Sequence, residues 1–489
     1  MITLDTYDVK IFTDRVEPGA LDQLRGLMAI PAFAGCRVRV MPDVHAGAGC
    51  VIGFTGDLGE KVVPNIVGVD IGCGILVQSL GALRHVDGHA LTAFIRAAIP
   101  SGRDFRDAHY EPLPVAYAAR RAEARQLVTQ LRCYRELRDV DRIRGSIGSL
   151  GGGNHFIEVD RDSQGRLYLL VHTGSRNLGK QVASLYQKLA VKCQSGWAEL
   201  MREQERLIAA YKAAGRRGEL QEAIRRLRGS FRMRPSSVPS DLAWLEGRER
   251  DDYLHDMRLC QRWAAINRRL VADLILGHLA ARPDGSVNPA ALRDEAFESV
   301  HNYIGEDNVI RKGAISARQG ERCIIPLNMR DGALLATGRG NADWNHSAPH
   351  GAGRVMSRRE AFERITMADY GAAMAGVYSE TVTPDTRDEA PMAYKPVAEI
   401  RRYLSETVDV DDTLAPSSTS KRRSEPCGRR DGGKSHGCGT VSTQRGGASA
   451  CGAGRLFLAV NQLEPTGGGG GCPNRRFFER EKRSTPCGT

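Results

Sequence analysis

The chain has 489 residues, twelve cysteines and a formal net charge of +11, and its length fits either two or three average domains or one large catalytic domain. It contains no run of about 18 apolar residues that would cross a membrane, and residues 1–9 lack the basic and apolar segments of a secretory signal. We therefore expect a soluble cytoplasmic protein without membrane partners, whose cysteines are free thiols rather than a disulfide framework.

Four short strands separated by glycine turns are predicted near the N-terminus, because β-branched residues recur there in brief runs. They are Arg37–Met41, Cys50–Phe54, Val62–Val69 and Ile75–Leu80. A polar helical stretch follows around Tyr117–Val140, and then a glycine cluster at 148–153. Two further strands, Phe156–Asp160 and Leu167–His172, are separated by a predicted turn at 163–165.

The middle of the chain, residues 180–280, is long, charged and helical in pattern, with a Pro and Ser interruption at 234–239. We expect two helical blocks packed on the sheet core. Strand and glycine patterns return at 301–341, and helix-like stretches follow at 354–376 and after Lys395 as far as Leu414. These elements indicate an α+β fold, with a β-sheet core flanked by helices and a helical insertion.

The composition changes abruptly after Pro416. Residues 417–489 hold 15 glycines and 13 Lys and Arg against 5 Asp and Glu, whereas residues 1–416 hold 56 Lys and Arg against 53 Asp and Glu. Such a segment cannot bury enough apolar surface to offset its ordering entropy, so we divide the chain into a catalytic domain, residues 1–416, and a disordered tail. Because the domain is nearly balanced in charge, any RNA groove in it must come from local clustering of cations.

The segment VGVDIGCG at 67–74 brings an acid and a thiol together at the end of an apolar run, with Asp70 and Cys73 three residues apart between glycines. A tight turn can aim both side chains at one point. A carboxylate and a thiolate suit a metal ion, which deprotonates the thiol and compensates the buried charge. The alternative is a strand-capping aspartate beside a buried, apolar cysteine.

Three histidines lie at or next to predicted strand ends. His155 is in GGGNHF, His172 in LVHTGSR and His301 in SVHNY. Imidazoles in such places are plausible metal ligands, although a single histidine is more often structural. Asn154 and Arg176 stand beside them and offer donors for phosphate oxygens.

A fourth motif, SAPHGAGRVMSR, places His350 before a turn of small residues that lets a ligand approach the backbone. Arg354 and Arg358 stand four residues apart, a helical spacing that suits phosphate or RNA backbone. Two phosphate-loop patterns, GSRNLGK at 174–180 and GRRDGGKS at 428–435, are interpreted as coincidental. The first lacks the hydroxyl ligand for Mg²⁺, and the second follows no strand.

In combination these motifs resemble the RtcB family of RNA ligases. The resemblance runs from about residue 5 to Pro416 and rests on MPDVHAGAG at 41–49, VGVDIGCG, GGGNHF, LVHTGSR, HNY, SAPHGAGRVMSR and PMAYK at 391–395. It implies the family's own α and β fold rather than a Rossmann sheet. It also implies an enzyme that uses GTP and Mn²⁺ to join an RNA 3′-phosphate or 2′,3′-cyclic phosphate end to a 5′-hydroxyl end, in RNA repair or tRNA splicing, with an archease-type activator as a further partner.

The resemblance assigns a pair of Mn²⁺ ions to this site. Cys73 would bridge them, with Asp70 and His155 completing one ion and His172 and His301 the other. Considered by themselves, a thiolate and imidazoles favour Zn²⁺ over Mn²⁺. The family pattern argues for Mn²⁺, and we expect Zn²⁺ to bind the same site and inhibit.

The resemblance also gives His350 the place of the nucleophile, which would attack the α-phosphate of GTP and carry GMP as a covalent adduct. Asp43 would support the metal shell. The residues implied around the guanylate are Asn154, His155, Asn302, Gly351, Ala352, Gly353 and Tyr394.

Two features depart from the family pattern. PLNMRDG at 326–332 stands where many members carry PGSMG, and Ala333 stands where a serine is usual. In addition, members end in a short apolar run and a lysine that contacts the nucleotide, whereas the nearest lysine here, Lys421, lies among polar residues. An alternative function is therefore a nucleotide- or RNA-binding protein with impaired ligation, and a further one is a metal phosphodiesterase that only opens cyclic ends.

Overall fold

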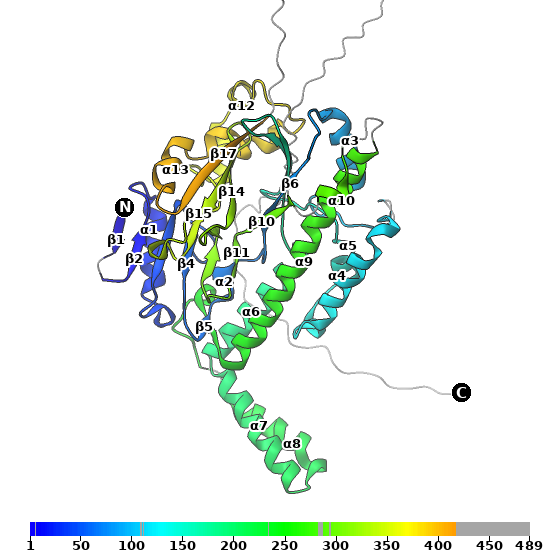
Figure 1. Cartoon of the computed structure of the whole chain (residues 1–489). Coiled ribbons are helices and arrows are strands. Elements are labelled where there is room, and N and C mark those ends of the chain that lie inside the picture. The colour runs from blue at the N-terminus through cyan, green and yellow to red at the C-terminus, as the bar shows by residue number, and fades with distance from the viewer. Residues whose placement is uncertain are drawn as a thin grey trace, which may run out of the picture.

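A curled, seven-stranded antiparallel sheet forms one half of the core (Figure 1). Its strands, in spatial order, are β10 (Phe297–Val300), β6 (Gly74–Ser79), β8 (Leu167–Thr173), β7 (Phe156–Arg161), β17 (Val408–Pro416), β15 (Gly332–Gly338) and β14 (Arg322–Asn328). The two outer strands approach each other, since the backbone N–H of Ile324 on β14 donates to Ser299 Oγ on β10 at 3.1 Å. The α+β class expected from the sequence is confirmed.

A six-stranded sheet forms the other half. Its strands, in spatial order, are β1 (Ile2–Leu4), β2 (Val9–Ile11), β3 (Val38–His45), β4 (Ile52–Gly56), β12 (Ile310–Lys312) and β11 (Asn302–Ile304), and only β2 and β3 run parallel. Two short ribbons accompany the sheets, β13 (Ala314–Ser316) with β16 (Ser347–Pro349) and β5 (Lys61–Val62) with β9 (Leu245–Glu246). A single residue, His301, separates β10 from β11, so the chain crosses between the two large sheets at this histidine.

The computed structural model describes residues 1–416 apart from residues 5, 108–109, 111, 233, 282–286 and 293–294. The predicted disordered tail, its five cysteines, its phosphate-loop pattern and Lys421 lie outside the described residues. The seven cysteines in the described part are all free thiols, as predicted. Among the helices of this part, none has the length and apolar character needed to cross a bilayer.

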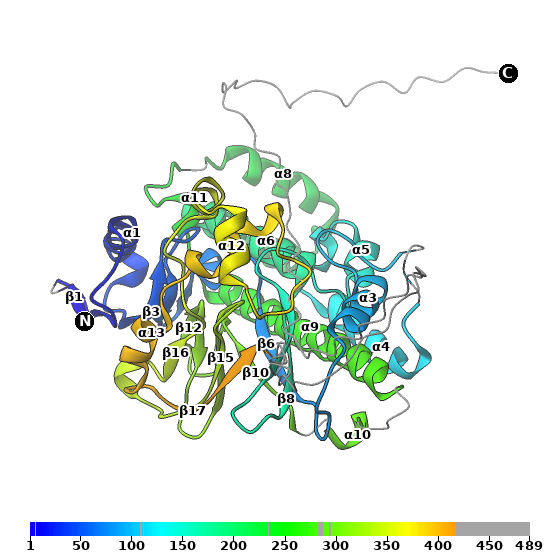
Figure 2. The same ribbon diagram turned by 90° about the horizontal axis from the view of Figure 1, so that it is seen from above.

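Helices cover the sheets on several sides (Figure 2). They are α1 (Pro18–Met28), α2 (Pro64–Val67), α3 (Gly88–Ala98), α4 (Ala118–Gln130), α5 (Val140–Gly145), α6 (Arg176–Gln194), α7 (Trp197–Ala213), α8 (Leu220–Ser230), α9 (Gly247–Ala280), α10 (Pro289–Leu292), α11 (Arg358–Arg364), α12 (Met367–Ala373) and α13 (Val397–Leu404). The longest, α9, has 34 residues and spans about 51 Å at 1.5 Å per residue. It packs along β6 and β8, and it buries Tyr253 and Trp263 completely or nearly so.

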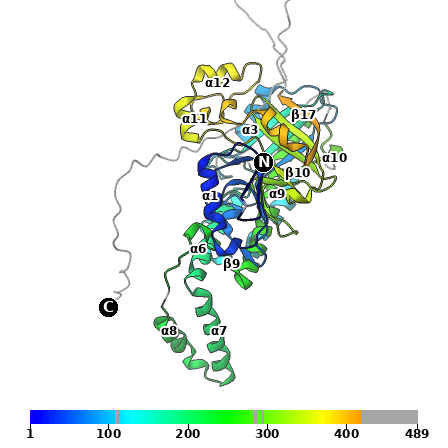
Figure 3. The same ribbon diagram turned by 90° about the vertical axis from the view of Figure 1, so that its left-hand side faces the viewer.

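The helical insertion differs in part from the prediction of two blocks packed on the sheet core. Helices α6 and α9 do pack there, but α7 and α8 form a hairpin that projects away from the body (Figures 1 and 3). On α7 only Leu200 is buried, and α8 buries no residue. Solvent therefore surrounds this hairpin on nearly all sides, which explains its charged sequence.

Two other predictions of secondary structure were wrong. The apolar run 62–69 is not one strand, because Pro64 begins the short helix α2 after the two-residue strand β5. The helix expected to reach Leu414 ends at Leu404, and the next residues form β17 instead. The alternation of Val408 and Val410 with acids has the strand period of two.

Candidate metal and nucleotide site

The predicted metal ligands come from the same end of neighbouring strands. Cys73 immediately precedes β6, His155 immediately precedes β7, and His172 lies one residue from the end of β8. His172 is directly opposite Ile75 on β6 and Phe156 on β7. Because paired strands are about 4.8 Å apart, this register brings the three side chains together.

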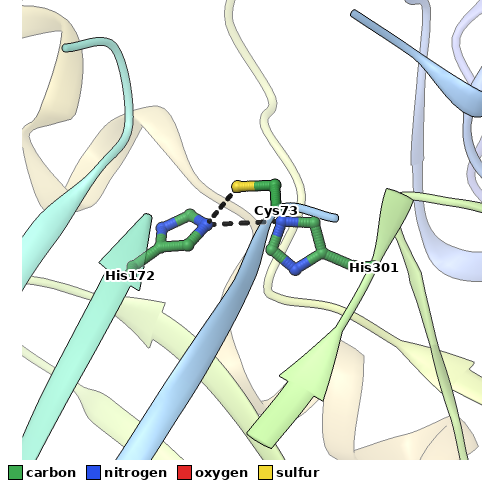
Figure 4. A group of neighbouring side chains, drawn as sticks. All are labelled: Cys73, His172 and His301. Carbon is green, nitrogen blue, oxygen red and sulfur yellow. Dashed lines mark hydrogen bonds between the residues drawn. The ribbon is translucent and has the colours of Figure 1, made fainter. Parts of the chain in front are cut away.

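The ligand atoms of the predicted metal ligands lie close to one another, and Figure 4 shows three of these residues, Cys73, His172 and His301. Cys73 Sγ is 3.3 Å from Nε2 of His155 and 3.3 Å from Nε2 of His172, and His172 Nε2 is 3.3 Å from Nε2 of His301. Asp70 Oδ2 is 2.9 Å from Nε2 of His155. Atoms that bind one ion at about 2.0–2.3 Å in a tetrahedral arrangement are themselves about 3.3–3.8 Å apart, so the three separations of 3.3 Å suit metal binding.

The cluster divides into two groups that share the thiol. One is Cys73, His172 and His301, and the other is Asp70, Cys73 and His155; within each group all ligand atoms lie within 4.8 Å of one another. All of these side chains except that of Asp70 are buried. The described residues therefore form a cluster able to bind metal, with the sulfur at its centre.

Backbone carbonyls orient the imidazoles. His155 Nδ1 donates to the carbonyl of Leu150 at 2.9 Å, and His172 Nδ1 donates to that of Asn154 at 3.0 Å. A carbonyl only accepts, so the proton of each neutral ring resides on Nδ1 and the lone pair of Nε2 faces the cluster. Ligand geometry is thus fixed by the glycine-rich segment that contains Leu150 and Asn154.

Electrostatics favour neutral imidazoles and a cation among them. Burial lowers the pKa of His172 and His301 well below the usual range, so both rings are neutral at physiological pH. Burial and the charge of Asp70 raise the pKa of the Cys73 thiol well above the usual range. The protein alone therefore keeps the thiol protonated, and a metal ion would supply the charge that deprotonates it.

His350 follows β16 and lies beside the cluster, with its ring centroid 4.9 Å from that of His301. Its Nδ1 donates to Oδ2 of Asp43 at 2.7 Å, and the same oxygen accepts the backbone N–H of Gly351 at 3.2 Å. Gly353 has φ of 74°, and a Cβ there would lie 2.3 Å from the carbonyl oxygen of Asp43, so this turn requires glycine. The contacts of Asp43 place it beside His350 rather than in either ligand group.

A cavity of about 350 Å³ opens over the cluster and His350. Of the predicted site residues, only Asp43 and His155 are not on its wall; Asp70, Cys73, Asn154, His172, His301, Asn302, His350, Gly351, Ala352, Gly353 and Tyr394 all line it. The segment PLNMRDG contributes Pro326, Leu327, Asn328 and Met329 to the wall, whereas Ala333 is not on it. The departure from the family pattern at 326–329 therefore faces the cavity.

The two arginines predicted to bind phosphate, Arg354 and Arg358, form ion pairs with acids. Arg354 precedes α11 and donates to the carbonyl of Asp388 at 2.6 Å, and Arg358 donates to Glu389 at 2.6 Å and to the Asp388 carboxylate. Tyr394 donates its hydroxyl to Glu389. Both guanidiniums line the cavity, and the Arg358 side chain is exposed there, so phosphate binding by these arginines stays a prediction.

Glu158 also lines the cavity and was missed from the sequence. It is completely buried on β7, on the same face as Phe156 two residues before it. Its signal was an acid at an inward position of an otherwise apolar strand next to His155. A carboxylate on a cavity wall can accept hydrogen bonds from a ligand, so this position points to binding.

The pattern GSRNLGK at 174–180 follows β8 and leads into α6, but the helix begins at Arg176, too early to leave a phosphate-binding loop. The backbone N–H of Ser175 donates to Asp70 Oδ1 at 3.1 Å, and Arg176 Nη2 donates to the carbonyl of Gly102 at 3.1 Å. This turn therefore supports the metal cluster, which agrees with its interpretation as a coincidental phosphate-loop pattern.

Comparison with known proteins gives consistent matches. A family model described as "tRNA-splicing ligase RtcB" matches residues 23–422. The RNA-splicing ligase RtcB of Escherichia coli K12 is 32% identical over 446 residues, which cover 85% of this chain and 97% of that protein. RNA-splicing ligase RtcB1 of another E. coli strain is 33% identical with the same coverage, and the tRNA-splicing ligase RtcB of Pyrobaculum aerophilum is 25% identical over 73% of this chain and 81% of its own length.

Proposed function

The chain belongs to the RtcB family of RNA ligases, and we propose that it joins RNA 3′-phosphate or 2′,3′-cyclic phosphate ends to 5′-hydroxyl ends with GTP and two Mn²⁺ ions. The observation that carries this proposal is the pair of ligand groups sharing Cys73, with His350 beside them over one cavity. RNA repair or tRNA splicing is the proposed context, and an archease-type protein is the proposed activator.

The proposed metal arrangement uses Cys73 as the bridge, with Asp70 and His155 for one ion and His172 and His301 for the other. When bound, the ions would neutralise phosphate charge and align the attacking group. The donor set by itself favours Zn²⁺, so the assignment of Mn²⁺ rests on family membership.

His350 is the proposed nucleophile. With its Nδ1 proton donated to Asp43, the lone pair of Nε2 is free to attack the α-phosphorus of GTP. The new N–P bond forms as the bond to the β-phosphate breaks, and pyrophosphate leaves with the electron pair. GMP then passes to the RNA 3′-phosphate, and attack by the 5′-hydroxyl on that activated phosphate releases GMP. A cyclic end must first be hydrolysed to the 3′-phosphate.

Glu158 is the proposed basis of the preference for guanine. A carboxylate accepts hydrogen bonds, and the Watson–Crick edge of guanine offers two donors, N1–H and the 2-amino group. Adenine presents an acceptor at N1, which would leave the buried carboxylate of Glu158 facing a lone pair. Asn154, Asn302 and Tyr394 on the same wall are the proposed further contacts of the guanylate.

Lys421 is proposed to take the place of the lysine with which family members end. The range of the family match continues to residue 422 and so includes Lys421. If Lys421 does not contact the nucleotide, the alternative of a family member with impaired ligation applies. The polar neighbours of Lys421, 417–420, remain a departure from the apolar run of the family.

The test is covalent labelling with α-labelled GTP and Mn²⁺, followed by ligation of a broken RNA hairpin. The protein should acquire one labelled GMP and seal the hairpin, and His350→Ala should do neither while remaining folded. His89→Ala, which removes an exposed imidazole on α3 that pairs with Glu380, is the matched control. Labelling that persists in His350→Ala would refute the assignment of the nucleophile, and labelling without sealing would support the alternative function.

A further inference from the structure

A second cavity, of about 840 Å³, lies among the loop after α3 and the helices α4 and α5, which gather on one side of the molecule (Figure 2). The described residues of its wall include four arginines from three separate segments and two aspartates. The arginines are Arg106, Arg121, Arg125 and Arg144, and the aspartates are Asp107 and Asp141. Cations therefore predominate in it, although residues 1–416 as a whole are nearly balanced in charge.

Two of the four guanidiniums are available for a ligand. Arg121 and Arg125 are one helical turn apart on α4, so they share a face. Unlike Arg120, which pairs with Asp273, neither of them forms an ion pair with a carboxylate of the described residues. Arg144 pairs with Asp141 at 3.2 Å. Burial and the neighbouring charge of Arg121 lower the pKa of Arg106 to about 10, which reflects a concentration of positive charge that a bound anion would relieve.

Hydrogen bonds to backbone groups connect this cavity to the metal site. Arg106 Nη2 donates to the carbonyl of Gly148 at 3.0 Å, in the glycine-rich segment that leads to His155. Gly102 donates its N–H to the carbonyl of Gly151 at 2.9 Å and accepts from Arg176 beside the metal cluster. Gly102 and Arg106 are four positions apart in the chain, so the two lie within about 14 Å even if the chain is extended.

We propose that this arginine cavity binds the phosphodiester backbone of the RNA substrate a few nucleotides away from the end being joined. The proposal rests on the RNA ligase activity, because the 3′-phosphate end must enter the metal site and the rest of the strand must lie on the surface nearby. Arginine forks suit phosphate oxygens, and several of them hold a strand in register without reading its sequence. The 3′-phosphate itself stays in the metal site.

The test compares RNA binding by Arg121→Gln/Arg125→Gln with binding by a matched control, Arg217→Gln/Arg225→Gln. The control removes the same charge from the projecting hairpin, where neither arginine has an acid partner among the described residues. Fluorescence anisotropy is measured with Mn²⁺ present and without GTP, using a 3′-phosphorylated dinucleotide and a 3′-phosphorylated strand of about twelve nucleotides. For the long strand the cavity variant should bind about tenfold more weakly at physiological salt, and its slope of log K against log salt should fall by about 1.4, or 0.7 for each phosphate that is no longer neutralised.

The dinucleotide should bind the cavity variant and the unmodified protein equally, and covalent guanylylation should also be unchanged, which shows that the fold and the first chemical step are intact. Arg125→Gln alone, at an exposed position, should give about half of the change in salt slope if the double variant proves unstable. The proposal would be overturned by equal losses of affinity for both RNA lengths, by an unchanged salt slope or by an equal loss in the hairpin control. It would also be overturned if tripolyphosphate competed for binding to the cavity and RNA did not. Because binding is measured without GTP, no ligation takes place, and these results are independent of the proposed ligation chemistry.

Discussion

Asp43→Asn should slow guanylylation without removing metal, because Asp43 acts through His350. The substitution exchanges a carboxylate for an amide of nearly the same shape at a completely buried position. Oδ2 accepts from His350 Nδ1 at 2.7 Å and from the N–H of Gly351 at 3.2 Å, whereas Oδ1 has no hydrogen-bond partner in the described part of the chain. An asparagine that keeps its oxygen toward His350 therefore preserves both contacts and loses only the charge.

The expected size of the effect follows from that charge. A hydrogen bond to a charged group contributes about 1.5–3 kcal/mol, compared with about 1 kcal/mol between neutral groups. Because the His350 ring becomes positive as Nε2 attacks, losing the difference of about 0.5–2 kcal/mol in the transition state should slow guanylylation by about 2- to 30-fold. If the amide nitrogen faces His350 instead, the ring proton moves to Nε2 and removes the nucleophilic lone pair, and the loss is larger still.

The assay is single-turnover labelling with saturating GTP, combined with metal analysis of the same samples. Asp343→Asn is the control, since it removes a carboxylate that pairs with Lys10 on the surface. A guanylylation rate within roughly twofold of the unmodified protein, less than about 0.4 kcal/mol in barrier height, would refute a role of Asp43 in orienting His350. A parallel loss of metal would instead place Asp43 in the metal shell.

Four further substitutions probe other parts of the molecule. Cys73→Ala should eliminate bound metal and ligation together, because it removes the ligand common to both groups, whereas Cys36→Ala should retain full metal content by elemental analysis. Glu158→Gln should reduce the preference for GTP over ATP in guanylylation by about 10- to 100-fold. An unchanged preference for GTP over ATP would show that Glu158 does not recognise the base. Burial raises the pKa of Asp307, but pairing with two arginines outweighs burial and lowers this pKa from 3.8 to about 2. The contribution of Asp307 to stability is therefore present above pH 3.8 and is lost as the pH falls towards 2. Asp307→Asn should therefore lower the free energy of unfolding by about 2 kcal/mol at pH 7. Urea denaturation should show a smaller difference between the variant and the unmodified protein at pH 3. Lys421→Ala should slow guanylylation and raise the KM for GTP, and an unaltered KM would show that the nucleotide is held without this lysine.

The sequence was most informative about the site and least informative about how the insertion and the last strand are arranged. Ligand residues could be predicted because the site depends on particular side chains at strand ends, as with Cys73 before β6 and His155 before β7. The acid partners of Arg354 and Arg358 could not be predicted, because Asp388 and Glu389 are about 30 residues away in sequence. The projection of α7 and α8 could not be predicted, since a charged helix has the same pattern whether its apolar residues face a sheet or one other helix.

The position of β17 has a consequence for the order in which the protein is completed during synthesis. Although β17 is the last described strand, it lies inside the seven-stranded sheet, where it joins β7 on one side to β15 on the other. Until residues 408–416 have emerged from the ribosome, those two neighbours each present an unpaired edge, and open edges pair readily with other chains. A nascent chain that stopped before Val408 should therefore aggregate or be degraded, rather than persist as a shorter ligase.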